Sequence, residues 1–232
     1  MKRHQMSVLE FMDGLERGLV LDAGSGTDAI GSALKEAGFR VVALDLYEAT
    51  TMQGRFVRAD LNENLPFIGD AFDYVLCSES LQYLENHAKL FREFTRLVKK
   101  GGSLILSLPN ILNASSRLYF LRRGYYPGFK PIRTIVEKKG WDKVVFNAVS
   151  LVEIMGLGVR AGFELKEIKA SGYKRSAYLL YPLLKASYCM GGMGRALETE
   201  KDSAKASLLR VLSSKDALLG DHLVVRLERM GR

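Results

Sequence analysis

The sequence predicts an α/β fold, a Rossmann-like seven-stranded sheet that is mostly parallel and carries helices on both faces. Residues 19–39 form an apolar run, a glycine turn and a helical pattern, which is the basic unit of such a sheet. Short apolar runs with helical patterns between several of them predict the seven strands, at residues 19–21, 39–44, 56–59, 72–77, 104–108, 163–168 and 222–227. A chain of 232 residues with 47% hydrophobic and 26% charged residues fits a single domain over residues 1–232.

The residues before the first strand predict an amphipathic helix within residues 1–17, with Val8, Phe11 and Met12 on its apolar side. No uninterrupted apolar core precedes a small-residue cleavage site, and no apolar run reaches the roughly 20 residues that a membrane-spanning helix needs. We therefore expect a cytoplasmic protein without a transmembrane segment. The chain has two cysteines and three scattered histidines without metal-ligand spacing, so no metal site is expected.

The glycine turn after the first strand is the most informative stretch. Asp22 ends the strand, Gly24 and Gly26 follow, and Asp28 begins a helical pattern that stops at Gly38. A strand, a glycine turn and a helix N-terminus together present free backbone N–H groups. This combination predicts a nucleotide-binding edge.

Two interpretations of the turn compete with a purely structural role. Residues 24–29 satisfy G-x-G-x-x-A, and Asp45 follows about twenty residues later, as in the dinucleotide-binding fingerprint of nicotinamide-dependent oxidoreductases. Asp22, however, lies two residues before Gly24, where a carboxylate would repel a diphosphate. The same carboxylate suits the cationic amino and sulfonium groups of S-adenosylmethionine, so the second interpretation is favoured.

The stretch VLDAGSGT resembles the first motif of class I S-adenosylmethionine-dependent methyltransferases. Four further blocks that resemble this family follow in the right order, so the resemblance covers most of residues 19–110, 150–169 and 222–228. It implies a methyltransferase with S-adenosylmethionine as cofactor, and a last strand that runs antiparallel to the others.

The resemblance also implies a set of cofactor-binding residues at the ends of the first four strands. The acid after the second strand would bind the ribose hydroxyls, and the acid after the third would reach the adenine amine. The implied residues are Asp22, Gly24, Ser25, Gly26, Asp45, Leu46, Asp60, Leu61 and Ser78.

The chain departs from the family pattern at two places. The family often has a third glycine where this chain has Asp28, which could cap the following helix or alter the donor pocket. Histidines often follow the fourth strand, where this chain has Gln82 and Tyr83. No catalytic base is therefore assigned. For a hydroxyl acceptor, Glu79, Tyr83, His87 or a lid tyrosine could serve, with His87 expected on a helix surface. A cofactor-binding protein that acts through partners without catalysis stays an alternative.

Two helices with clear signals separate the later strands. Asn86 is predicted to cap a helix that runs to Lys99 and stops at Gly101. Ser150 and Glu153 predict a capping box at the start of a helix that Gly162 ends.

Two insertions interrupt the family pattern. Residues 111–147 carry a basic and aromatic segment, with eight basic and two acidic residues between 117 and 143. The family commonly has a lid over the acceptor here, so we expect a small or lipid/sugar-linked acceptor that is acidic or phosphate-bearing. Single-stranded nucleic acid and a plain basic surface loop are alternatives. Residues 171–220 predict helices for core or homodimer packing, with a membrane-surface contact as the alternative.

Overall fold

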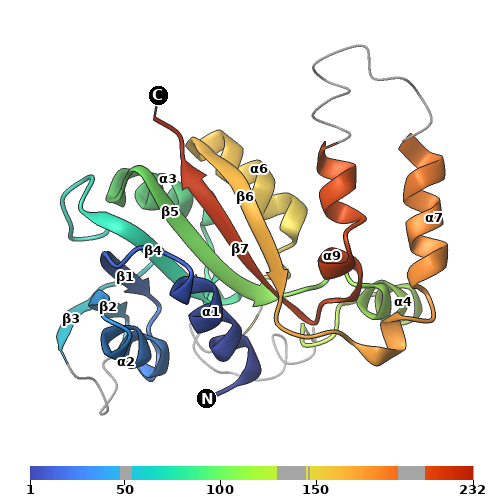
Figure 1. Cartoon of the computed structure of the whole chain (residues 1–232), viewed down its shortest axis with the longest axis horizontal. Coiled ribbons are helices and arrows are strands. Elements are labelled where there is room, and N and C mark those ends of the chain that lie inside the picture. Colours follow the sequence, from blue (N-terminus) through green and yellow to red (C-terminus); the bar gives the residue numbers. More distant parts are fainter. Residues whose placement is uncertain (48–53, 130–144, 146, 193–206, 232) are drawn as a thin grey trace.

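The computed structural model describes residues 1–47, 54–129, 145, 147–192 and 207–231, and contains a seven-stranded sheet (Figure 1). The strands follow the order β3-β2-β1-β4-β5-β7-β6, and β7 is antiparallel to both of its neighbours. This confirms the predicted mostly parallel sheet with an antiparallel last strand. The bounds are β1 Leu19–Ala23, β2 Arg40–Asp45, β3 Arg55–Arg58, β4 Phe72–Ser78, β5 Val98–Pro109, β6 Phe163–Ala170 and β7 His222–Arg229.

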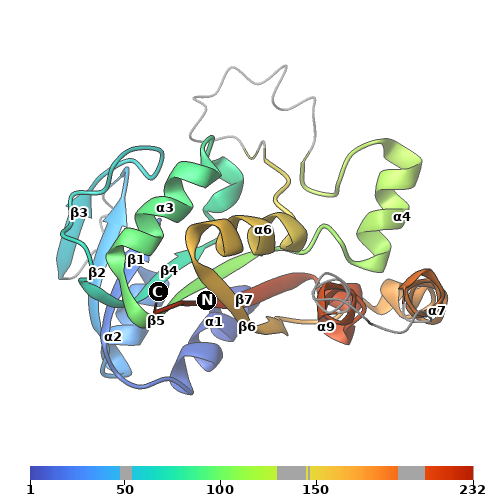
Figure 2. The same cartoon turned by 90° about the horizontal axis from the view of Figure 1, so that it is seen from above.

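Helices cover both faces of the sheet (Figure 2). On one face, α3 (His87–Leu97) and α6 (Leu151–Ala161) pack on strand residues that include Leu21 and Leu104. On the other face, α1 (Arg3–Asp13) and α2 (Ala29–Glu36) pack on Val20 and Ile105, which adjoin Leu21 and Leu104 in the strands. Successive strand side chains point to opposite faces, so a strand buried on both sides needs the continuous apolar run that the sequence shows.

The strand β5 begins earlier than predicted. The helix α3 ends at Leu97 and β5 starts at Val98, so Gly101 lies inside the strand and the predicted helix stop there is wrong. A Cβ on Gly102 would lie 2.7 Å from the backbone oxygen of Asp73, and the β4–β5 register shifts nearby, between Phe72 and Tyr74. Gly102 therefore allows a close strand approach at an irregular start of the ladder.

Both predicted helix caps form, one of them only in part. The Asn86 side chain accepts a hydrogen bond from the Lys89 N–H, and Ser150 accepts one from the Glu153 N–H at 3.1 Å. Glu153 itself reaches the His87 ring, with 3.5 Å between Oε1 and Nδ1. The prediction of a surface position for His87 is wrong, because the residue is buried and its Nε2 lies 2.8 Å from the Leu81 oxygen. This contact between His87 and Leu81 thus stabilises the loop before α3.

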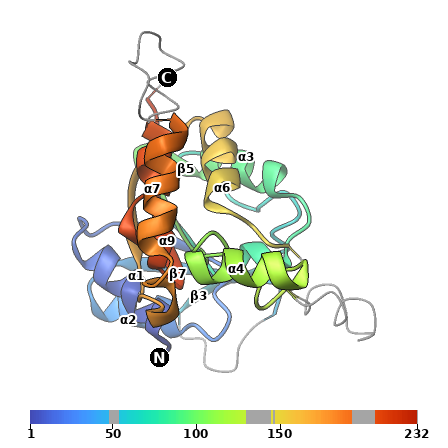
Figure 3. The same cartoon turned by 90° about the vertical axis from the view of Figure 1, so that its right-hand side faces the viewer.

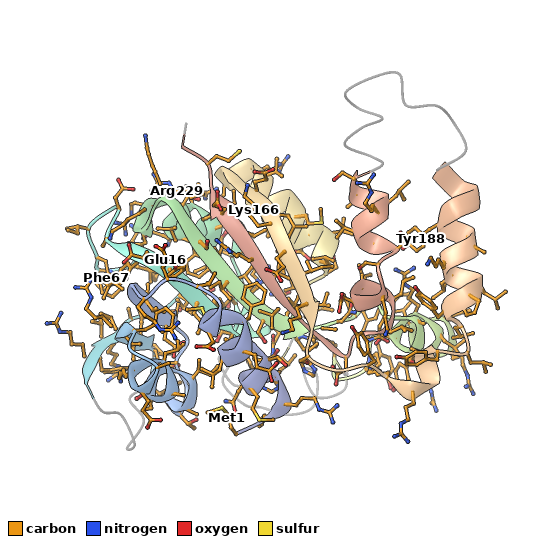
Figure 4. The ribbon with its side chains drawn as sticks, in the orientation of Figure 1. Met1, Glu16, Phe67, Lys166, Tyr188 and Arg229 are labelled. Carbon is orange, nitrogen blue, oxygen red and sulfur yellow. The ribbon has the colours of Figure 1, made fainter. Side chains whose placement is uncertain are left out.

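The two insertions form a helical lobe beyond the carboxyl end of β5 (Figures 1 and 3). It contains α4 (Ala114–Arg123), η3 (Arg175–Ala177), α7 (Tyr181–Gly192), a helical stretch at 207–212 and α9 (Lys215–Leu219). Tyr188 projects from α7 (Figure 4), and its hydroxyl accepts a hydrogen bond from Arg117 of α4 at 2.8 Å. Much of the predicted basic lid, residues 130–144, lies outside the described residues. Within the described ranges, no helix is long and apolar enough to cross a membrane.

Candidate functional site

A cavity of about 640 Å³ lies at the carboxyl edge of the sheet, and its walls come from the ends of β1, β2 and β4 and the loop after β3. Carboxyl ends of parallel strands meet at one edge, so residues distant in the sequence converge there. Seven of the nine predicted cofactor residues line this cavity: Gly24, Gly26, Asp45, Leu46, Asp60, Leu61 and Ser78. Asp22 and Ser25 are not part of the lining.

The glycine turn is fixed to β2 by backbone hydrogen bonds. The N–H groups of Gly24 and Ser25 both donate to the Leu44 oxygen, at 2.8 and 3.1 Å. Gly24 has a φ of +84°, and a Cβ there would lie 2.2 Å from the Ser80 Oγ. Only glycine fits this position, because both the left-handed backbone and the close approach exclude a side chain.

The carboxylate of Asp45 is held in place at the cavity wall. Its Oδ2 accepts a hydrogen bond from the Gly26 N–H at 2.9 Å, and its Oδ1 accepts one from the Tyr47 N–H at 3.0 Å. Each oxygen has further acceptor capacity. The side chain is therefore preorganised to accept hydrogen bonds from a pair of ligand hydroxyls.

Another part of the cavity wall is built around Asp60, in the loop after β3. Its Oδ1 accepts hydrogen bonds from the Asn62 N–H at 2.8 Å and from the Asn62 side-chain amide at 3.1 Å. Asn62 in turn accepts a hydrogen bond from the Glu85 N–H at 2.8 Å, which ties this loop to the loop after β4. Leu61 and Leu84, both almost fully buried, add apolar surface beside these polar groups. Such a combination of a flat apolar wall and a few fixed polar atoms suits a nucleobase.

Asp22 lies beneath the glycine turn, and only 1% of its surface is exposed. Its Oδ2 has no hydrogen-bond partner among the described residues. Burial, and next the negative charges of Asp28 and Asp45, raise the pKa of Asp22 to about 7. The sequence did not reveal this burial, because aspartate is mostly exposed in folded proteins and rarely lies fully buried.

Asp28 adopts a left-handed backbone conformation, with φ at 58°. Glycine takes this conformation freely and aspartate tolerates it, which gives a physical reason for a glycine at this position in related sequences. The side chain makes no cap hydrogen bond, so the predicted capping role is wrong. Its Oδ2 instead accepts hydrogen bonds from Ser32 Oγ at 2.9 Å and Lys35 Nζ at 3.3 Å.

Two of the candidate bases, Glu79 and Tyr83, line the cavity, whereas His87 does not. Glu79 also has a positive φ, 56°, an unusual conformation that tends to occur at functional sites. Its Oε1 accepts a hydrogen bond from Ser107 Oγ at 3.0 Å, and its Oε2 lies 3.8 Å from His222 Nε2. The His222 ring stacks on His4 of α1, with 5.1 Å between ring centroids. Burial, and next the charge of Glu79, raise the pKa of Tyr83.

Sequence reasoning missed several residues that come from loops. Tyr47, Asn62, Leu84 and Glu85 line the cavity but carry no motif of their own. Among the described residues, no group of three or more His, Cys, Asp or Glu side chains could hold a metal ion.

Comparisons with known proteins agree with this geometry. The family model described as "Methyltransferase domain" matches residues 21–106, which contain every residue of the cavity lining. A demethylmenaquinone methyltransferase from Clavibacter sepedonicus is 34% identical over 38% of this chain and 39% of its own length. A ubiquinone biosynthesis O-methyltransferase from Pseudomonas paraeruginosa is 29% identical over 62% of this chain and 69% of its own length. Three relatives are more than 30% identical to this chain, and the chain covers only 19%, 39% and 20% of their respective lengths.

The fold is also that of solved methyltransferases. A structure of a SAM-dependent methyltransferase from Archaeoglobus fulgidus superposes with a TM-score of 0.61 and covers 98% of this chain and 95% of that chain, at 15% identity. At this identity the likeness shows the fold alone, while the sequence match covers the strands and turns that build the cavity. The match over residues 21–106 and the shared fold support a class I S-adenosylmethionine-dependent methyltransferase, with S-adenosylmethionine as the cofactor that this family uses.

Proposed function

We propose that this chain binds S-adenosylmethionine in the cavity and transfers its methyl group to an acceptor that enters from the carboxyl edge of the sheet. The convergence of Asp45, Asp60 and the glycine turn around one cavity of about 640 Å³ carries the proposal. Asp45 would accept hydrogen bonds from the ribose hydroxyls. Asp60 and Leu61 would hold the adenine, and the backbone of residues 24–26 would face the methionine half, with Asp22 below it and Ser78 alongside.

The chemistry asks little of the protein beyond geometry. In methyl transfer the acceptor atom attacks the methyl carbon in line with the carbon–sulfur bond, and S-adenosylhomocysteine leaves as a neutral thioether. Holding the two reactants in line and excluding water therefore supplies most of the acceleration.

A hydroxyl acceptor also has to lose a proton, and we propose that Glu79 receives it. Glu79 is the described carboxylate that lines the cavity and has a histidine, His222, within 4 Å, at 3.8 Å. The relative from Pseudomonas paraeruginosa is named as an O-methyltransferase, which favours a hydroxyl acceptor.

The acceptor class follows from charge. Arg122 and Arg123 lie in the last turn of α4, in the lobe beyond the end of β5, and Arg117 lies in the same helix. Positive charge on this side of the cavity favours an acidic or phosphate-bearing acceptor, either a small molecule or a lipid- or sugar-linked one.

The test is a calorimetric titration with S-adenosylmethionine and S-adenosylhomocysteine, followed by turnover with a panel of hydroxylated and phosphate-bearing acceptors. We expect micromolar binding, and a Glu79→Gln variant that keeps this affinity but loses about 10²–10⁴-fold in turnover on a hydroxyl acceptor. Binding without turnover on any acceptor would support the rival, a cofactor-binding protein without catalysis, which the aspartate at position 28, where the family often has a glycine, favours. Tight NADH binding without S-adenosylmethionine binding would contradict both.

A further inference from the structure

Two buried carboxylates, Asp22 and Asp28, lie beneath the glycine turn, and the proposed function above does not account for their protonation. We propose that the buried carboxyl group of Asp22 holds a proton beside Asp28 while the cofactor is absent, and that it releases this proton when the cationic methionine end of S-adenosylmethionine binds. This inference rests on the proposed function, because it concerns the same cofactor site.

The two carboxyl groups lie close together against α2. Asp28 Oδ1 and Asp22 Oδ2 approach one point, the position that a Cβ on Gly31 would occupy, at 2.4 and 3.2 Å. Each residue is 1% exposed, and neither of these two oxygens has a hydrogen-bond partner among the described residues. The Ser25 Oγ, in the turn above them, is buried without a partner in the same way. Unpaired buried acceptors are costly, so the space between them calls for a proton or a cation.

The surrounding charges do not balance the pair. Asp28 and Asp45 both act on Asp22 with negative charge, and Lys35 is the cation that acts on it, from the far side of Asp28. Like charges at short range cannot all stay ionised in a buried site, so one proton is retained. The pKa of Asp22, raised to about 7 chiefly by burial, agrees with this arrangement.

The cofactor would bring the missing positive charge. S-adenosylmethionine carries an ammonium and a sulfonium group, and the glycine turn would place its methionine half directly above the pair. The added cations favour the ionised form of Asp22, so its proton passes to the buffer as the cofactor binds. S-adenosylhomocysteine lacks the sulfonium charge, so its binding should release fewer protons per site than the binding of S-adenosylmethionine.

Calorimetric titration with S-adenosylmethionine in phosphate and in Tris buffer measures the number of protons released per bound cofactor, because the two buffers differ in ionisation enthalpy. For the wild-type chain we expect release of about half a proton per site near pH 7, and an affinity that falls by up to about tenfold per pH unit below about pH 6. Asp28→Asn removes one charge and suits the left-handed backbone. This variant should lose most of the proton release. Its affinity for S-adenosylmethionine should also fall less between pH 8 and pH 6 than that of wild type, by a factor of at least about five.

The cofactor amine itself titrates near pH 8, but it contributes equally to every variant, so the difference between variants is diagnostic. Asp13→Asn is the matched control, because Asp13 is an exposed carboxylate of α1 whose removal changes the net charge equally. It should behave as wild type. If wild type and Asp28→Asn release the same number of protons and share one pH profile of affinity, the inference is overturned while the proposed function stands.

A ligand-free measurement separates the two proposals further. Urea unfolding between about pH 5 and pH 8 should show wild-type stability falling with pH more steeply than that of Asp28→Asn. Equal slopes would overturn the proposal that Asp22 holds a proton beside Asp28, even if the cofactor does not bind at all. Should the asparagine variant fail to fold, Asp28→Gly replaces it, because glycine adopts the φ of 58° freely.

Discussion

Asp22→Asn should stabilise the unliganded protein at high pH. The carboxyl group of Asp22 has a pKa of about 7, raised from an ordinary value of 3.8 by burial and by two neighbouring carboxylates. Each pKa unit corresponds to about 1.4 kcal/mol, so ionising this group in the folded protein costs at most roughly 4 kcal/mol. Asparagine has the same shape and carries no charge. Its amide can also donate to the unpaired Oδ1 of Asp28.

The sign of the pH dependence follows from the raised pKa. The folded protein binds the Asp22 proton more tightly than the unfolded chain does. The contribution of protonated Asp22 to the free energy of unfolding is therefore fully present below about pH 4 and is lost as the pH rises through about 7. We expect Asp22→Asn to raise the free energy of unfolding by about 2–4 kcal/mol near pH 8.5 and by little near pH 4.

Urea unfolding followed by far-ultraviolet circular dichroism at the two pH values measures this difference, with Asp13→Asn as the exposed control. The reasoning is refuted if Asp22→Asn shifts the free energy of unfolding equally at both pH values, or lowers it near pH 8.5. The same variant should bind S-adenosylmethionine more weakly, because stabilising a strained site commonly removes function.

Three further predictions concern the cavity and its support. Asp45→Ala should weaken S-adenosylmethionine binding by about 10–100-fold in calorimetry, since it removes charge-assisted hydrogen bonds worth about 1.5–3 kcal/mol each, and an unchanged affinity would contradict the ribose role. Gly24→Ala should lower the thermal midpoint of unfolding by about 5 °C or more, because the added Cβ would lie 2.2 Å from Ser80 Oγ at a φ of +84°. In the control variant Gly26→Ala the added Cβ would meet no atom within 4 Å, so the midpoint should fall less. Glu93→Gln should cost about 1–3 kcal/mol of stability at pH 7, because Arg96 and the Leu65 N–H lower the pKa of Glu93. That cost should shrink as the pH falls through this lowered pKa, and a constant cost down to pH 2 would refute the assignment.

Much of the sheet, and seven of the residues that line the cavity at its carboxyl edge, could be predicted from the sequence. Apolar runs mark strands that are buried on both faces, and parallel strands bring their carboxyl ends together, so Asp45 and Asp60 could be assigned to one edge without coordinates. The glycine turn could be placed because few residues fit its backbone.

Other features depend on tertiary context that a linear pattern does not carry. The sequence predicts that Asp22 ends the first strand, but β1 continues to Ala23, and Asp22 is buried beside Asp28, which raises its pKa. Gly101 reads as a helix stop, yet an irregular β4–β5 ladder continues through it. Tyr47, Asn62 and Glu85 reach the cavity from loops whose paths are set by hydrogen bonds between distant residues.

A crystal structure of the chain with S-adenosylhomocysteine would test the central claim most directly. We predict a ribose whose two hydroxyls lie within hydrogen-bond distance of Asp45, an adenine beside Asp60 and Leu61, and a methionine tail against Gly24 and Gly26. Nucleoside density at any other place, or a cavity that stays empty at saturating ligand, would contradict the account.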